Sequence, residues 1–156
     1  MLEVSLRDEN FTDWPALLDL IRRAFAYMAP RIDPPSSMRL LTEQSIAEKA
    51  EAETLLLARD GEKLVGCVFL RDMGEAMYMG KLAVDPAVQG SGAGRALVKR
   101  AVDYCREAGK RRIELESRIE LTEVHDFFRR HGFRETGRTT HAGYTRPTAI
   151  VMTLDL

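Results

Sequence analysis

The chain has 156 residues, of which 45% are hydrophobic and 30% are charged, a composition typical of one globular domain with a substantial core. Lysine plus arginine (23) nearly balances aspartate plus glutamate (24), which argues against a nucleic-acid-binding protein that works through a dominant basic field. The charge is nevertheless uneven, because residues 1–90 hold 15 acids and 10 bases whereas residues 91–156 hold 9 acids and 13 bases. The basic half could serve a polyanionic ligand or form a solvated surface.

The first third of the chain predicts a strand, a helix and a long loop. Residues 2–8 alternate apolar and polar side chains, as a half-buried strand does. Thr12 or Asp13 is expected to cap a helix that carries Pro15 in its first turn. The proline-rich and serine-rich residues 29–37 predict a loop, and long loops often border binding sites.

The middle of the chain predicts one more helix and then three strands. A helix is expected from Thr42 to Ala52. The run 54–72 contains Asp60-Gly61, a strong hairpin signal, and therefore predicts two strands joined by a turn. A further apolar run over 76–84 ends at Asp85-Pro86.

The remaining elements alternate between helices and strands. Apolar residues recur at helical spacing after the glycine-rich stretch until Gly109, residues 111–117 alternate as a strand, and a short helix covers 121–130. Two final strands come from 132–139 and 148–156. Six or seven strands with four helices predict an α/β domain built on a mixed sheet.

Cys67 and Cys105 occupy apolar positions of a strand-like run and a helix-like run, which predicts two buried, reduced thiols. The first residues do not form a cleavable leader, and no apolar run approaches the roughly 20 residues that span a bilayer. We therefore expect a cytoplasmic protein with no membrane or nucleic-acid partner.

Three glycines within five positions, Gly90, Gly92 and Gly94, stand between a strand and a helix. Unpaired N–H groups and a positive dipole end make a helix N-terminus an anion site, and glycines allow close approach. A phosphate-binding loop of ordinary nucleotidases is excluded, because no Gly-Lys-Ser/Thr occurs. A dinucleotide fingerprint is disfavoured, because Arg95 or Leu97 stands where Gly or Ala is needed.

The stretch Gln89–Gly94 resembles the acyl-CoA pyrophosphate loop of the GNAT superfamily of N-acetyltransferases. The preceding "KLAVDPAVQG" (81–90) and the later "FFRRHGF" (127–133) are similar to family segments too, so the resemblance covers most of the chain. It implies a single acyl-CoA-binding domain over 1–156. It also implies an α/β (α+β) fold with a mixed, mostly antiparallel sheet of six or seven strands, about four helices and a splayed central strand pair.

The resemblance also implies acetyl-CoA as co-substrate and a set of residues that bind it. The pyrophosphate would lie on backbone N–H groups, and the splayed strand would pair with the pantetheine amides. The implied cofactor-binding residues are Leu82, Ala83, Val84, Gln89, Gly90, Ser91, Gly92, Ala93, Gly94, Arg95 and Phe128.

Acetyl transfer needs a neutral amine, stabilisation of the oxyanion and a proton donor for the thiolate. The family's usual Tyr donor corresponds to Phe128 and its usual Asn to Leu121, so neither group is available here. Tyr78, Glu116 and His125 are the candidate catalytic groups. Each also has a structural reading: an aromatic on the sheet, a solvent-facing carboxylate and a surface histidine.

His141, Tyr144 and Arg146 belong to an unusual segment before the last strand, which in the family often borders the acceptor site. They are expected to shape a substrate pocket together with loop 29–37, or alternatively to protect an edge strand from aggregation.

The sequence thus predicts a metal-free N-acetyltransferase that moves the acetyl group directly to a primary amine of a small molecule or peptide. A homodimer is possible. Acidic residues in the first half would weakly favour a cationic acceptor: Glu43, Glu48, Glu51 and Glu53. Two other hypotheses stay open, a catalytically inactive acyl-CoA-binding regulatory module and a nucleotide-binding protein that uses the same anion loop.

Overall fold

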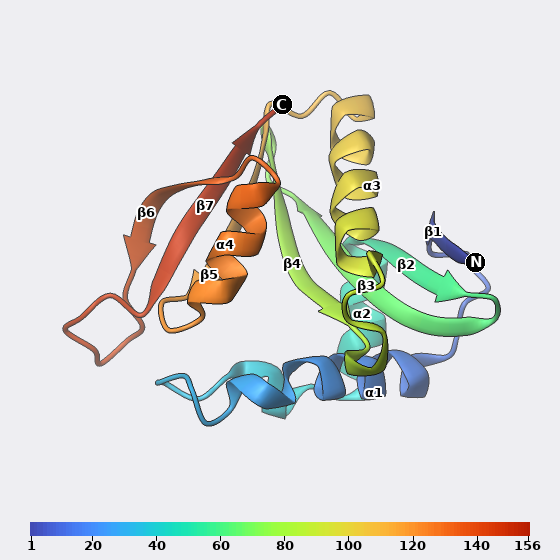
Figure 1. Cartoon of the computed structure of the whole chain (residues 1–156), viewed down its shortest axis with the longest axis horizontal. Coiled ribbons are helices and arrows are strands. Elements are labelled where there is room, and N and C mark those ends of the chain that lie inside the picture. Colours follow the sequence, from blue (N-terminus) through green and yellow to red (C-terminus); the bar gives the residue numbers. More distant parts are fainter.

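The computed structural model describes all residues 1–156 and is organised around one seven-stranded sheet (Figure 1). The strand order is β1-β2-β3-β4-β5-β7-β6, and every neighbouring pair is antiparallel except β4 and β5. The predicted mixed, mostly antiparallel sheet is therefore confirmed. The strands are β1 (Leu2–Leu6), β2 (Thr54–Asp60), β3 (Lys63–Asp72), β4 (Ala76–Val84), β5 (Arg112–Arg118), β6 (Arg134–Thr139) and β7 (Ala149–Asp155).

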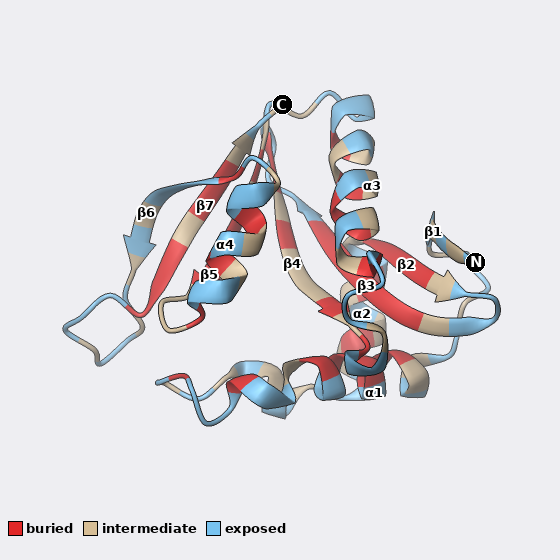
Figure 2. Cartoon of the chain, in the orientation of Figure 1, coloured by how far each residue is buried: buried red, intermediate tan, exposed pale blue.

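Four α-helices cover the two faces of the sheet (Figures 1 and 2). Helices α1 and α2 pack on one face around Ile21, Ile46 and Phe69, whereas α3 and α4 pack on the other around Leu97 and Phe128. The helices are α1 (Trp14–Phe25), α2 (Glu43–Ala52), α3 (Ala93–Glu107) and α4 (Thr122–Arg130), with short 3-10 turns η1 (Ala26–Met28), η2 (Ser37–Leu40) and η3 (Pro86–Val88). No helix combines the length and the apolar character that crossing a bilayer requires.

The capping residues expected from the sequence lie at or within one residue of the observed helix starts. Asp13, rather than Thr12, caps α1, because its Oδ1 accepts a hydrogen bond from the Ala16 N–H at 3.2 Å. Thr42 caps α2 in a reciprocal pair with Ser45, whose hydroxyl and N–H both bond to Thr42. The helix expected over 121–130 begins one residue later, and Leu121 is its buried N-cap.

The central strands β4 and β5 diverge after a short parallel contact. They pair only where Ala76–Tyr78 lies beside Arg112–Glu114; beyond this point β4 pairs with β3 alone and β5 with β7 alone. The two halves of the sheet consequently form a V, and the glycine-rich loop before α3 lies at its open end (Figure 1). The predicted splayed strand pair is confirmed.

A close helix contact at Gly66 fixes α3 on the sheet. A Cβ added to Gly66 would lie 2.8 Å from Leu97 Cδ1 and 3.1 Å from the Ala83 carbonyl oxygen. Leu97 is fully buried, so it has no free space into which to move.

We therefore expect Gly66→Ala to lower the free energy of unfolding by about 1–3 kcal/mol through overpacking. Urea unfolding monitored by circular dichroism measures the loss. Gly137→Ala is the matched control, because its added Cβ would meet only ordinary contacts at 3.9 Å. Equal stability of the two variants would contradict the close-contact explanation.

Candidate active site

A cavity of about 820 Å³ opens where β4 and β5 separate, a volume within the range of small-molecule sites. Its wall combines β4, the glycine-rich loop, the start of α3, β5, α4 and the segment after α1. Twelve residues singled out from the sequence line it: Tyr78, Leu82, Val84, Gln89, Gly90, Gly92, Ala93, Gly94, Arg95, Glu116, Phe128 and His141. Five do not line it: Ala83, Ser91, His125, Tyr144 and Arg146.

The glycine-rich loop presents bare backbone at one end of this cavity. Gly90 and Gly92 have φ values of +87° and +91°, in the left-handed region, and a Cβ on either would meet no atom within 4 Å. The first helical hydrogen bond of α3 runs from the Ala96 N–H to the Gly92 carbonyl at 2.9 Å. The N–H groups of the first turn therefore stay available for an anion.

Asp85 connects the start of the glycine-rich loop to α1. Its side chain is 3% exposed, and its Oδ1 accepts hydrogen bonds from the Ala87 N–H and from Arg23 Nη1, both at 2.9 Å. The Ala87 N–H first, and then Arg23, hold the pKa of Asp85 below its ordinary value of 3.8. The sequence marked Asp85 only as the end of a strand, but the structure makes it the anchor of the loop on α1.

Replacing this anchor should cost stability in a pH-dependent way. Because the pKa of Asp85 is lowered by folding, its ionised form stabilises the protein above about pH 3.8 and this contribution fades as the pH falls further. We expect Asp85→Asn to lower the free energy of unfolding by about 2 kcal/mol at pH 7, because two hydrogen bonds lose their charged acceptor. Urea unfolding at pH 7 and pH 3 tests this, and an equal loss at both values would contradict it.

Strand β4 offers both side chains and backbone to the cavity. Leu82 and Val84 line it, whereas the Ala83 side chain is 2% exposed and packs in the core beneath α1. Ala83 therefore offers no side chain to the cavity, and its backbone pairs with Cys67 of β3. Because β5 has diverged at this level, the β5-facing edge of β4 has no strand partner.

Helix α4 contributes apolar groups but no proton donor. Phe128 and Leu121 are both buried and line the cavity. His125 was a candidate catalytic group or, alternatively, a surface histidine, but it is buried, and its Nε2 lies 2.9 Å from the Arg118 carbonyl oxygen. This contact joins α4 to the end of β5. Because His125 does not line the cavity, it is not among the catalytic groups that we propose.

Tyr78 and Glu116 face the cavity from the two diverging strands. Tyr78 is half-buried, and burial first, then the negative charge of Glu116, raise its pKa above the ordinary value of 10.0. The guanidinium of Arg71 lies 4.8 Å from the centre of its ring. Tyr78 therefore keeps its proton at neutral pH, while the exposed Glu116 carboxylate can accept one.

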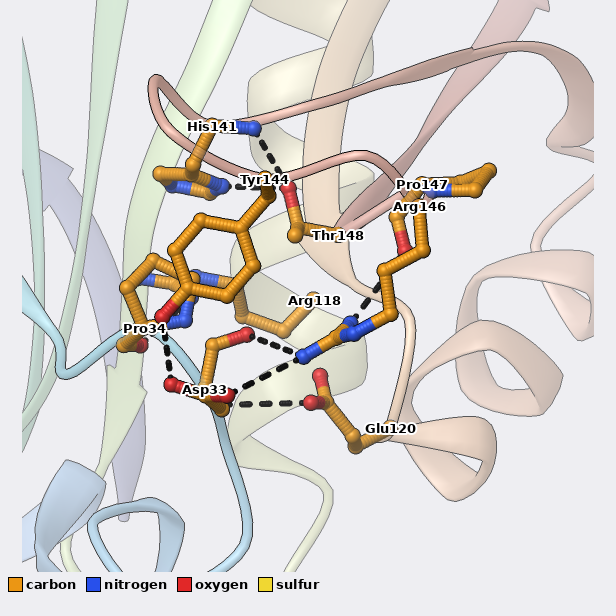
Figure 3. Close-up of polar contacts among 9 residues, drawn as sticks. All are labelled: Asp33, Pro34, Arg118, Glu120, His141, Tyr144, Arg146, Pro147 and Thr148. Carbon is orange, nitrogen blue, oxygen red and sulfur yellow. Dashed lines mark hydrogen bonds and ion pairs between the residues drawn. The ribbon is translucent and has the colours of Figure 1, made fainter.

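The segment before β7 is attached to loop 29–37, as Figure 3 shows. Tyr144 Oη donates to Asp33 Oδ1 at 2.5 Å, and Arg146 Nη2 lies 3.1 Å from the Asp33 carbonyl oxygen. Arg118 Nη1 donates to the Pro34 carbonyl at 2.7 Å. His141 lines the cavity directly, whereas Tyr144 and Arg146 act on its shape only through the loop that they hold.

Eight charged or aromatic residues of the cavity were not among the candidate site residues: Phe25, Tyr27, Lys49, Lys81, Arg118, Glu123, Phe127 and Arg130. Lys81 alone had a usable signal, because it is the one charged residue inside the apolar run 76–84. No group of three or more His, Cys, Asp and Glu side chains is placed to hold a metal ion.

Comparison with known proteins gives concordant results. Residues 14–133 match the model of the acetyltransferase (GNAT) family. The chain is 36% identical over 107 residues to aminoglycoside N(6')-acetyltransferase type 1 of Stenotrophomonas maltophilia, an alignment that covers 63% of this chain and 69% of that protein.

Two solved structures share the fold. The ribosomal-protein-S18-alanine N-acetyltransferase of Escherichia coli superposes with a TM-score of 0.79 at 24% identity, over 99% of this chain and 94% of that one. The PaiA N-acetyltransferase of Thermoplasma acidophilum, solved in complex with coenzyme A, superposes with a TM-score of 0.82 at 13% identity, over 99% of both chains. The chain belongs to the acetyltransferase (GNAT) family and is an N-acetyltransferase that uses acetyl-CoA.

Proposed function

We propose that residues 1–156 form a single acyl-CoA-binding domain that transfers acetyl directly from acetyl-CoA to a primary amine in a ternary complex. The observation that carries this proposal is the continuous cavity from the free N–H groups of α3 to Tyr78 and Glu116. One end suits a diphosphate, and the other holds a proton acceptor beside a proton donor.

The cofactor would be held mainly by backbone. The N–H groups from Gln89 to Arg95 would bind the pyrophosphate, except that of Ser91, which donates to the Val88 carbonyl oxygen at 3.1 Å. The unpaired edge of β4 from Leu82 to Val84 would pair with the pantetheine amides. Phe128 would pack against the thioester end, because it is a buried cavity residue on α4.

The transfer itself would need three proton movements. Glu116 would take a proton from the acceptor ammonium, directly or through water. The neutral amine would then attack the thioester carbon, the carbon–sulfur bond would break, and Tyr78 Oη would protonate the departing thiolate. The acetylated nitrogen would lose its second proton, through water, to the Tyr78 oxygen, which restores the tyrosine. The products are the N-acetylated amine and coenzyme A.

The cysteines support direct transfer rather than an acetylated enzyme. Cys67 and Cys105 are both fully buried, and burial raises the pKa of Cys67 to about 12 and that of Cys105 to about 11. Neither thiol is therefore ionised or accessible as a nucleophile at neutral pH.

The test is a thermal-shift and thiol-release screen with acetyl-CoA and four acceptor classes: aminoglycosides, amino acids, peptides that begin with alanine, and polyamines. The proposal expects acetyl-CoA to raise the Tm and at least one class to release coenzyme A. A rise in Tm without thiol release from any amine would instead favour an inactive acyl-CoA-binding module. Stabilisation by ATP or NAD in preference to coenzyme A would favour a nucleotide-binding protein.

Two further proposals concern the protein as a whole. A cytoplasmic location is tested by cell fractionation, and a homodimer by light scattering of the purified protein. Neither affects the assignment of the cavity, because all of its proposed groups come from one chain.

A further inference from the structure

Lys81 is the residue of the cavity whose conformation is least expected. Its φ of +50° makes it the only non-glycine residue of the chain in the left-handed region, where a long side chain is uncommon. It lies where the register between β3 and β4 shifts, so the strand bulges at this point. Such backbone outliers concentrate at ligand sites, and Lys81 lines the cavity.

The ammonium group of Lys81 has no anionic partner. The side chain is half-buried, no carboxylate lies within 4.0 Å of its Nζ, and its one polar contact is Met38 Sδ at 3.5 Å. A thioether is a weak acceptor, so this contact compensates little of the lost hydration. Burial first, and then the positive charge of Lys49, lower the pKa of Lys81.

Three other charged residues of the cavity, Lys49, Glu123 and Arg118, already have partners. Lys49 lines the same cavity, but its Nζ lies 2.6 Å from Glu53 Oε2. On α4, Glu123 is paired with Arg31, and at the end of β5 Arg118 donates to carbonyl oxygens of loop 29–37. Lys81 and Glu116, on the two diverging strands, are left without an ion-pair partner within 4.0 Å; the other unpaired cations of the cavity, Arg95 and Arg130, are exposed residues of α3 and α4.

The backbone of β4 gives the spacing between Lys81 and the Tyr78 that neighbours Glu116. Tyr78, beside Glu116, precedes Lys81 by three residues on β4, which corresponds to at most about 10 Å of extended strand. A ligand with an amine at one end and an anion at the other would satisfy both charges at once.

We propose that the acceptor is an amino carboxylate, whose carboxylate pairs with Lys81 Nζ while its amine faces Glu116. The proposal rests on the acetyl transfer proposed above and names its substrate class. It replaces the weak expectation of a cationic acceptor, because Glu43, Glu48, Glu51 and Glu53 all lie outside the cavity wall.

The experiment compares matched acceptors with and without the negative charge. Glycine, L-alanine, β-alanine and 4-aminobutyrate are each paired with the corresponding primary amide, and wild type, Lys81→Met and Lys99→Met are assayed for thiol release. Lys99→Met is the control, because Lys99 is exposed on α3 and outside the cavity. Lys81→Gly is a second variant, since glycine adopts the φ of this position without strain.

The expected result is a 10- to 100-fold preference of wild type for at least one carboxylate over its amide in kcat/KM. Both Lys81 variants should lose this preference through KM, with kcat changed less than about threefold, and Lys99→Met should retain it. The proposal would be overturned if wild type had the same kcat/KM for the carboxylate and the amide of every acceptor pair. An equal fall in kcat for both members in Lys81→Met would also overturn it, since Lys81 would then act in the proton transfer.

Calorimetry distinguishes a failure of the proposed carboxylate site from a failure of the proposed acetyl transfer. The same acceptor pairs are titrated into wild type and Lys81→Met, each loaded with coenzyme A. Tighter binding of a carboxylate that disappears in Lys81→Met would support the site even if no acceptor were acetylated. Absence of binding by every carboxylate would overturn the site, whether or not other amines were turned over.

Discussion

The variant Gly92→Asp should bind coenzyme A about 100-fold more weakly than wild type while remaining folded. The new carboxylate would stand at the start of α3, where the N–H groups are expected to hold the pyrophosphate. Two like charges about 4 Å apart near a protein surface repel by about 4 kcal/mol, and about 2.8 kcal/mol already corresponds to 100-fold in affinity. Calorimetric titration with coenzyme A measures the effect.

The matched control is Gly92→Asn. Any side chain at this position is strained, because φ is +91°, but none collides, because no atom lies within 4 Å of the added Cβ. Aspartate and asparagine share this strain and nearly the same volume, so the difference between the two variants reports the charge alone. Equal affinities of the two variants would refute the assignment of the loop.

The second large effect is expected from Tyr78→Phe, which should lower kcat about 100-fold with little change in the KM for acetyl-CoA. The substitution removes only the hydroxyl that would protonate the thiolate. A roughly 100-fold fall in kcat is within the range usual for the loss of a general acid. Burial and Glu116 raise the pKa of this hydroxyl, so wild type keeps its donor well into the alkaline range. Steady-state thiol release over a range of pH measures the loss.

Tyr104→Phe provides the control for this variant. Tyr104 loses the same hydroxyl, but that hydroxyl bonds to Thr54 Oγ1 at 3.2 Å and lies outside the main cavity. Its kcat should remain that of wild type. If Tyr78→Phe also kept the wild-type kcat, Tyr78 would be a packing residue and the donor would have to be water.

Much of the fold could be predicted because its signals are local. The hairpin at Asp60-Gly61, the capped helix after Thr42 and the strand–loop–helix around Gly92 depend on a few neighbouring residues and on backbone conformations that those residues favour. All residues of the loop 89–95 except Ser91 line the cavity, and pyrophosphate binding by this loop stays a prediction from the resemblance.

The chemistry of the cavity could not be predicted in the same way. Lys81 turns into the cavity at a bulge that the pairing with β3 creates, and His125 is buried by its contact with the end of β5. Tyr144 and Arg146 reach Asp33 across more than 100 positions of sequence. Spacing along the chain determined the elements and the anion loop, whereas only tertiary packing decided which polar groups meet, because burial and pairing depend on segments distant in sequence.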